Sequence, residues 1–262
     1  MKRAEGAWVI TGAASGFGAE FARRLRERGE RLVLWDRAEV PLKKIGRELG
    51  AHVEIVDVVD PAAVAEAVQR SADAAGPLAH VVSCAGILRV GPAATMPADD
   101  LRAMMDVNFH GTVNVVTALL PSLEAAASAD RPATILFVSS VAGLRGFPDL
   151  AGYSASKFAV LGYAQALRGE LRGRPFDVRV LCPPPGDTPM VRALDEVPPV
   201  YRLSRLYSAA EVVDAALAGL EGHAFKIFVD AGSKILHRID RVAPAVVDGI
   251  VALSPHLPSK RG

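Results

Sequence analysis

The chain has 262 residues, half of them hydrophobic, and this length suits one α/β domain built around a single large core. The formal net charge of +1 does not indicate a nucleic-acid-binding surface. Two cysteines, Cys84 and Cys182, are too few for a disulfide framework and indicate a reducing compartment. Because no signal peptide precedes the first expected strand and no apolar run reaches the roughly 20 residues of a membrane span, we expect a cytoplasmic protein.

Short apolar runs alternate with helical patterns along most of the chain. The runs with the length and composition of buried strands are Trp8–Ile10, Arg31–Trp35, His52–Val56, His80–Ser83, Thr134–Val138 and Val178–Leu181. The stretches with apolar residues three and four positions apart, as in amphipathic helices, are Ala19–Arg28, Pro61–Ala75, Leu101–Leu120 and Ser154–Leu171. This alternation predicts a single-domain Rossmann fold, a doubly wound parallel sheet between two layers of helices. Ligands of such sheets bind beyond the carboxyl ends of the strands.

A glycine-rich segment, Thr11-Gly12-Ala13-Ala14-Ser15-Gly16-Phe17-Gly18, follows the first expected strand. Gly12 would allow a tight turn, Gly16 would let the backbone approach a pyrophosphate, and Gly18 would let helix and strand pack closely. The next helix would present free N–H groups to the phosphates. The alternative is a plain strand-to-helix turn, but the position after the first strand favours a dinucleotide site. The expected cofactor contacts here are Gly12, Ala14, Ser15, Gly16, Phe17 and Gly18.

Asp36 ends the second expected strand, at a position where a carboxylate can bind the ribose hydroxyls of NAD. The same carboxylate would repel the extra phosphate of NADP. At about 4 Å and an effective dielectric near 20, each unit of like charge costs roughly 4 kcal/mol. We therefore expect NAD to be preferred. NADP stays an alternative, because the neighbouring Arg37 could offset part of the repulsion and Asp36 could serve only as a helix cap.

Tyr153 and Lys157 stand four residues apart at the start of an expected helix, so both lie on one face. Lowering a tyrosine pKa from near 10 by about three units takes about 4 kcal/mol. An ammonium within about 4 Å and an oxidised nicotinamide ring together supply that order of energy. Ser140, after the fifth expected strand, could grip the substrate oxygen. Each residue alone has a structural interpretation, but their placement after a dinucleotide segment favours hydride transfer to or from a carbonyl carbon.

These motifs resemble those of the short-chain dehydrogenases/reductases. Thr11–Gly18 matches the family's TGxxxGxG motif, Tyr153–Lys157 its YxxxK motif and Ser140 its catalytic serine. The resemblance implies that Asn108 holds a water molecule connecting the lysine to solvent, and that the protein is a homodimer or homotetramer. The cofactor contacts it implies beyond the glycine-rich segment are Asp36, Arg37, Asp57, Val58, Ala85, Gly86, Tyr153, Lys157, Pro183, Gly186 and Thr188.

Two segments depart from the family pattern. The family's NNAG is Ser83-Cys84-Ala85-Gly86 here, so both amides are missing while the last glycine remains. The usual Pro-Gly pair is replaced by Cys182-Pro183-Pro184-Pro185-Gly186-Asp187-Thr188-Pro189. This proline run is similar to the PPDTDTP segment of 3-ketodihydrosphingosine reductases, which implies a long-chain lipid ketone as substrate. That branch typically uses NADPH, whereas Asp36 favours NAD.

The expected substrate side is apolar and comprises Val141–Leu150 and a lid over residues 190–210. The side chains expected to contact a bulky nonpolar substrate, lipid-like or steroid-like, are Leu144, Phe147, Met190 and Leu194, with Pro148, Val191 and Tyr201 beside them. The alternative is a mobile lid whose apolar groups only cover the core.

The apolar C-terminal segment, residues 238–257, is expected to be a packed helix or a subunit contact. A membrane-resting edge is the alternative, because Arg238, Arg241, Lys260 and Arg261 flank this segment. No metal site is expected, since His110 and His223 have no partners at ligand spacing.

We therefore expect an NAD(P)-dependent oxidoreductase acting on a hydrophobic secondary alcohol or ketone. The alternatives are an NADPH-linked 3-ketosphinganine-type reductase, a catalytically silent cofactor-binding regulatory protein, and a lipid-binding protein at a membrane surface.

Overall fold

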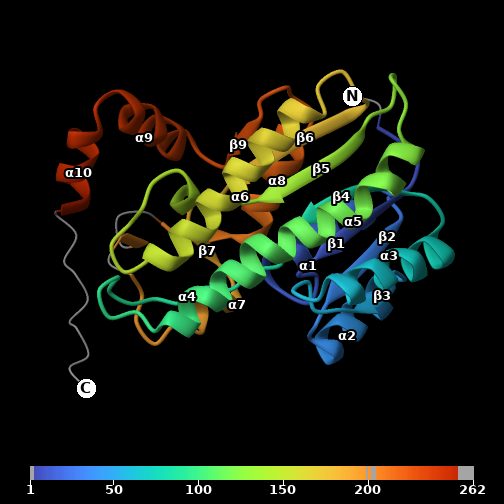
Figure 1. The fold of residues 1–262 in the computed structure, drawn as a ribbon, viewed down its shortest axis with the longest axis horizontal. Coiled ribbons are helices and arrows are strands. Elements are labelled where there is room, and N and C mark those ends of the chain that lie inside the picture. Colours follow the sequence, from blue (N-terminus) through green and yellow to red (C-terminus); the bar gives the residue numbers. More distant parts are fainter. Residues whose placement is uncertain (1–2, 199, 202–204, 253–262) are drawn as a thin grey trace.

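A parallel sheet runs through the centre of the computed structural model, which describes residues 3–198, 200–201 and 205–252 (Figure 1). Within these residues the sheet has seven strands in the order β3-β2-β1-β4-β5-β6-β9. The strands are β1 (Ala7–Thr11), β2 (Leu32–Asp36), β3 (His52–Ile55), β4 (Leu78–Ser83), β5 (Ala133–Val138), β6 (Phe176–Cys182) and β9 (Lys226–Phe228). The chain winds outward from β1 to β3 and then from β4 to β9 on the other side. The predicted doubly wound Rossmann fold is confirmed.

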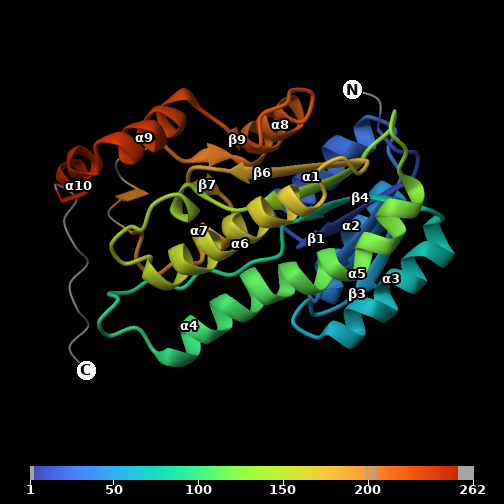
Figure 2. The same ribbon diagram turned by 45° about the horizontal axis from the view of Figure 1, so that its top comes forward.

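Helices cover both faces of the sheet (Figures 1 and 2). One face carries α1 (Gly16–Glu27), α2 (Glu39–Leu49) and α8 (Ala209–Gly219). The other carries α3 (Pro61–Ala75), α5 (Gly111–Ala126) and α6 (Ala151–Glu170). Alternation along β1 divides the core accordingly, because Trp8 and Ile10 pack toward α1 and α8 while Val9 packs toward α5 and α6. The inner strands β1, β4 and β5 are buried throughout, as expected for a parallel sheet covered on both sides, whereas the edge strands β3 and β9 are only partly buried.

The remaining elements lie near the carboxyl ends of the strands. They are α4 (Ala98–Met105), the π-helical segment Asp106–His110, the short 3₁₀ turn Val141–Gly143, α7 (Pro189–Arg192), α9 (Ala231–Val242) and α10 (Pro244–Ala252). A separate pair of short strands, β7 (Gly186–Asp187) and β8 (Tyr207–Ser208), is also parallel. In Figures 1 and 2, α9 and α10 lie together at one end of the molecule.

The six expected strands and four expected helical stretches are all present, with two differences. The stretch Leu101–Leu120 is helical throughout, but it is not one α-helix. The π-helical segment Asp106–His110 lies between α4 and α5 and connects them directly. The sequence interpretation also omitted β9, α2, α8 and the first half of α9, and the expected C-terminal helix is divided at Ala243 between α9 and α10. The membrane-resting edge at the C-terminal segment stays a prediction. No helix among the described residues is both long and apolar enough to span a membrane, and residues 253–257, Lys260 and Arg261 lie outside the described residues.

Candidate active site

A cavity of about 700 Å³ opens at the carboxyl ends of the strands. Most residues expected to contact cofactor or substrate line it: Gly12, Ser15, Gly16, Phe17, Gly18, Asp36, Arg37, Asp57, Val58, Ala85, Gly86, Ser140, Phe147, Tyr153, Lys157, Pro183, Gly186, Thr188, Met190, Val191 and Tyr201. Ala14, Asn108, Leu144, Pro148 and Leu194 are not on its wall. The cavity therefore brings together the glycine-rich segment and the tyrosine and lysine predicted from spacing.

The glycine-rich segment makes a turn that only glycine accommodates well. Gly12 has a φ of +67°, in the left-handed region. A Cβ at Gly18 would lie 2.1 Å from the Gly12 carbonyl oxygen, so a side chain there would push α1 away from the end of β1. The first turn of α1 consequently reaches the cavity wall, and its N–H groups have no acceptor within the helix. Such a wall fits the pyrophosphate of a dinucleotide.

Asp36 lines this cavity at the end away from Tyr153 and is already hydrogen-bonded. Its Oδ2 accepts the Ala14 N–H at 3.0 Å, and its Oδ1 accepts the Ala38 N–H at 2.9 Å. Because the Ala14 N–H is directed at Asp36, Ala14 supports the carboxylate, and its direct contact with the cofactor stays a prediction. Arg37 turns toward Asp57, with Nη1 3.6 Å from Oδ2, and so is paired with a carboxylate other than Asp36.

The segment that replaces the family's NNAG keeps its local bonds through other groups. Thr11 Oγ1 accepts the N–H groups of Cys84 and Ala85, at 3.0 and 3.1 Å, and thereby joins the ends of β1 and β4. Ser83 Oγ donates to Thr112 Oγ1 at 3.1 Å. Burial raises the pKa of the Cys84 thiol to about 12. The loss of both amides therefore leaves this turn intact.

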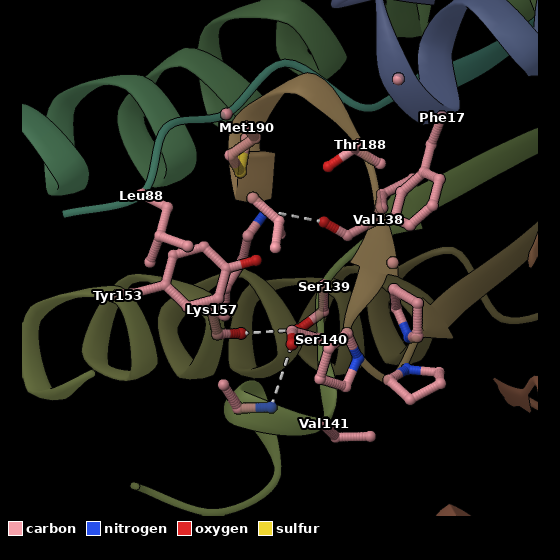
Figure 3. Close-up of a pocket in the computed structure, with 18 of the residues that line it drawn as sticks. Phe17, Leu88, Val138, Ser139, Ser140, Val141, Tyr153, Lys157, Thr188 and Met190 are labelled. Atoms are coloured by element: carbon pink, nitrogen blue, oxygen red, sulfur yellow. Dashed lines mark hydrogen bonds between the residues drawn. The ribbon is translucent and has the colours of Figure 1, made fainter. Parts of the chain in front are cut away.

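Tyr153 and Lys157 project from the start of α6 into the cavity, beside the 3₁₀ turn that begins after Ser140 (Figure 3). Lys157 is only 5% exposed, and its Nζ donates to the Val138 carbonyl oxygen at 2.9 Å. The Ser140 hydroxyl caps the turn by accepting the Ala142 N–H at 3.1 Å, and it lies close enough to Tyr153 to lower the pKa of the phenol. Strand β5 and helix α6 thus place the hydroxyl, the phenol and the ammonium at one wall.

The pKa of Tyr153 shifts in the direction opposite to the expected one. Burial raises the pKa of Tyr153 to about 12, and the nearby Ser140 hydroxyl lowers it only in part. Lys157 does not offset this, because its Nζ is 5.8 Å from the centre of the tyrosine ring and is held at Val138. Burial also lowers the pKa of Lys157, to about 8. The side chains of the protein alone therefore keep the phenol protonated at neutral pH.

Asn108 lies in the π-helical segment, fully buried behind the cavity wall. Its Oδ1 accepts the Ile87 N–H at 2.7 Å, and its Nδ2 donates to the Ile87 carbonyl oxygen at 3.0 Å and to Ser156 Oγ at 2.8 Å. A Cβ at Gly86 would lie 3.1 Å from Asn108 Oδ1 and 3.5 Å from Lys157 Nζ. Asn108 thus holds the loop after β4 at the depth that leaves open space beside Lys157.

The far end of the cavity, beyond Tyr153, is apolar. A buried cluster made of Leu88, Ala142, Phe147, Leu150, Val247 and Val251 packs around the tyrosine ring. Figure 3 shows Leu88 beside Tyr153 and Met190 opposite Lys157. Tyr201 is close enough that its charge state and that of Tyr153 interact, and burial raises the pKa of Tyr201.

Two of the four expected substrate residues, Leu144 and Leu194, are not on the cavity wall. Leu144 packs against the core between the sheet and α6, and Leu194 packs against the apolar cluster. The sequence interpretation missed the contribution of α9 and α10, whose lining residues are Gly232, Ser233, Leu236, Ile250 and Val251. The regular spacing of apolar residues along residues 231–252 was the sequence signal that could have predicted these two helices.

Comparison with known proteins agrees with this geometry. Residues 7–198 match the family model of short chain dehydrogenases. The chain belongs to the short-chain dehydrogenase family. A 1-deoxy-11-beta-hydroxypentalenate dehydrogenase of Streptomyces avermitilis is 35% identical over 235 residues, covering 86% of this chain and 85% of that enzyme. A 3-ketodihydrosphingosine reductase of Bacteroides thetaiotaomicron is 34% identical, covering 68% of this chain and 62% of that enzyme.

Solved short-chain dehydrogenases have the same fold. One from Burkholderia phymatum, in complex with NAD, superposes with a TM-score of 0.82 at 26% identity, covering 94% of this chain and 96% of that one. One from Burkholderia cenocepacia, in complex with NADP, gives 0.82 at 27% identity, covering 97% and 100%. This short-chain dehydrogenase is an NAD(P)-dependent oxidoreductase that acts on CH–OH groups.

Proposed function

We propose that this enzyme interconverts a bulky apolar secondary alcohol and its ketone with NAD(H). The observation that supports this most directly is the composition of a single cavity, which runs from Asp36 past Tyr153 to the apolar cluster around Leu88 and Phe147. The polar end fits a dinucleotide, and the apolar end gives a nonpolar substrate its contacts. The reacting carbon would lie between them, beside the phenol.

The preference for NAD follows from the charges at the polar end. Asp36 offers carboxylate oxygens to ribose hydroxyls, and Arg37 is directed to Asp57 and so does not neutralise Asp36. The first turn of α1 would hold the pyrophosphate, Thr188 would bind the carboxamide, and Asp57 and Val58 would flank the adenine. When bound, the nicotinamide supplies the acceptor or donor of the hydride.

The protein's side chains handle the proton and the oxygen. Ser140 and Tyr153 would both hydrogen-bond the substrate oxygen, because the two side chains line the same wall of the cavity. In the reducing direction Tyr153 gives its proton to the carbonyl oxygen, and in the oxidising direction it takes the alcohol proton. Its pKa of about 12 in the protein alone suits the acid role. The base role requires positive charge at the site, which the Lys157 ammonium supplies if it leaves Val138 for the ribose.

Replacing Tyr153 by Phe tests the assignment. We expect Tyr153→Phe to lower kcat at least a thousandfold while the Kd for NADH, measured by fluorescence titration, changes less than about threefold, because only the proton donor is removed. Tyr163→Phe is the matched control, since Tyr163 lies on the same helix with its hydroxyl at the far end, near Thr117. Retention of most of the activity by Tyr153→Phe would refute the acid-base role.

The substrate class is tested by a turnover screen. NAD(H) and NADP(H) would each be offered with hydrophobic alcohols and ketones, including a hydroxysteroid and 3-ketosphinganine. Preference for small hydrophilic alcohols would contradict the apolar assignment.

An NADPH-linked 3-ketosphinganine-type reductase is the second candidate. Two relatives favour it, the Bacteroides enzyme and a 3-dehydrosphinganine reductase of Arabidopsis thaliana that is 33% identical over 182 residues. Asp36 argues against NADPH, so turnover of 3-ketosphinganine with NADPH but not NADH would establish this candidate in place of the first. We further propose a homodimer or homotetramer, as the family resemblance implies, which light scattering on the purified enzyme tests.

A further inference from the structure

The apolar end of the cavity is closed by the C-terminal helix pair, α9 and α10. Leu236 of α9 and Val251 of α10 line the cavity, and Val247 is buried in the apolar cluster next to it. In the described residues α9 has no buried side chain, and α10 has only Val247 and Val251. Leu236 and Ile239 of α9 pack partly buried against the cluster, and His237 of α9 contacts Lys226 and Phe228 of β9. None of these contacts joins α10 to the body of the protein by a polar bond, so the angle of the pair depends on a further interaction.

Arg145 supplies that interaction. Its guanidinium pairs through Nη1 with Asp240 of α9 and through Nη2 with Asp248 of α10. The Arg145 side chain is only 16% exposed and the Asp240 side chain 18%, so the first pair is shielded from solvent. A planar guanidinium that binds one carboxylate with each terminal nitrogen fixes both position and angle. One side chain therefore joins both helices to the body of the enzyme.

The segment that contains Arg145 also positions residues of the active site. It connects Ser140 to Tyr153, and it turns Phe147 and Leu150 inward to the cavity while Arg145 reaches outward. The Arg145 N–H bonds the Val141 carbonyl oxygen at 3.3 Å, which ties the arginine to the 3₁₀ turn capped by Ser140. The distance between the tyrosine and the helix pair is thus set through this one segment.

We propose that Arg145 is a positioning residue that fixes the C-terminal helix pair over the apolar end of the cavity and thereby sets the size of substrate that the enzyme prefers. The proposal rests on the proposed function, since it assumes that the substrate occupies the apolar end. A large nonpolar substrate reaches Leu236 and Val251 and gains their contacts, whereas a small one needs only the groups around Tyr153. Releasing the pair should therefore penalise large substrates selectively.

The test compares wild-type enzyme, Arg145→Met, Arg145→Lys and Asp248→Asn on cyclohexanol, borneol and a hydroxysteroid, which are monocyclic, bicyclic and tetracyclic. Arg174→Met is the matched control, because Arg174 also pairs with a carboxylate, Glu124 at 2.5 Å, but at the opposite end of the sheet strands. Amide hydrogen exchange over residues 231–252 is measured on each protein without substrate.

We expect Arg145→Met to raise KM for the two larger alcohols by about tenfold, the order expected for lost charge-assisted hydrogen bonds, with kcat for cyclohexanol and KM for NAD unchanged. Exchange in α9 and α10 should quicken in Arg145→Met and Asp248→Asn, and Arg145→Lys should restore part of both properties. If Arg145→Met does not fold, Asp248→Asn, which removes only the pair to α10, decides the question.

An equal loss on all three alcohols, or unchanged exchange in α9 and α10, would overturn the proposal. If wild-type enzyme turns over none of the three alcohols, the proposed function fails separately. Amide exchange then still decides whether Arg145 holds the helix pair, because that readout needs no substrate.

Discussion

His80, in the middle of β4, makes the fold sensitive to acid in a way that can be measured. Its ring stacks on Trp8, with centroids 4.4 Å apart. The Thr134 N–H donates to His80 Nδ1 at 3.1 Å, so Nδ1 must be the unprotonated nitrogen. Nε2 then carries the hydrogen and donates to the Ala4 carbonyl oxygen at 3.0 Å. Protonation of Nδ1 would place two N–H groups against each other inside the sheet.

The magnitude follows from the pKa. Burial lowers the pKa of His80 from 6.5 to about 4. The folded protein then binds fewer protons than the unfolded chain, so the stabilisation is complete above pH 6.5 and is lost as the pH falls toward 4. The full difference is worth about 3.4 kcal/mol, at about 1.4 kcal/mol per pKa unit. Between about pH 7.5 and about pH 4.5 it amounts to about 2.5 kcal/mol.

The assay is urea unfolding at these two pH values for wild-type protein and His80→Gln, whose amide offers one donor and one acceptor but does not titrate. The variant is less stable at both pH values because it loses the stacking on Trp8. The quantity compared is therefore the change in the free energy of unfolding between the two pH values, and not the free energy itself. We expect wild-type protein to lose about 2.5 kcal/mol more than the variant between the two pH values. His223→Gln, on an exposed loop, is the control. Equal losses in wild type and His80→Gln would refute the assignment of a buried neutral histidine.

Two further predictions concern the cofactor end. Asp36→Ser should raise kcat/KM for NADP by about a hundredfold and lower it for NAD. The gain is smaller than the roughly 4 kcal/mol of repulsion would give, because solvent screens this partly exposed carboxylate. An unchanged ratio of kcat/KM for NADP to kcat/KM for NAD would show that Asp36 serves only its backbone bonds. Gly18→Ala should cost about 1–3 kcal/mol in thermal unfolding and weaken NADH binding, because its Cβ would meet the Gly12 carbonyl oxygen, whereas Gly162→Ala, in open space on α6, should be neutral or stabilising.

The fold and the catalytic residues could be predicted because local spacing determines them. Tyr153 and Lys157 share a face of α6 because residues four positions apart lie on the same side of any α-helix. The strands could be predicted because they are apolar runs followed by turns. β9 was missed because Lys226-Ile227-Phe228 is too short to stand out from its surroundings. The strand forms by pairing with β6, which is a tertiary contact.

The differences near the cavity arise where several distant segments meet. The pKa of Tyr153 depends on how burial compares with the distance to Lys157, and no spacing in the sequence gives either quantity. Leu144 was assigned to the substrate because it is apolar and follows Ser140, but its side chain packs against the core. Arg145 was passed over because its partners, Asp240 and Asp248, are nearly a hundred residues away.

The strand order has a consequence for synthesis of the protein. Moving outward from β1 in either direction, each strand comes later in the chain than its inner neighbour, so an emerging strand always adds to an edge that has already left the ribosome. Strands β1 to β4 have emerged long before α9 and α10 are made. Because these two helices follow every strand of the sheet, the apolar end of the cavity stays uncovered until they have been made.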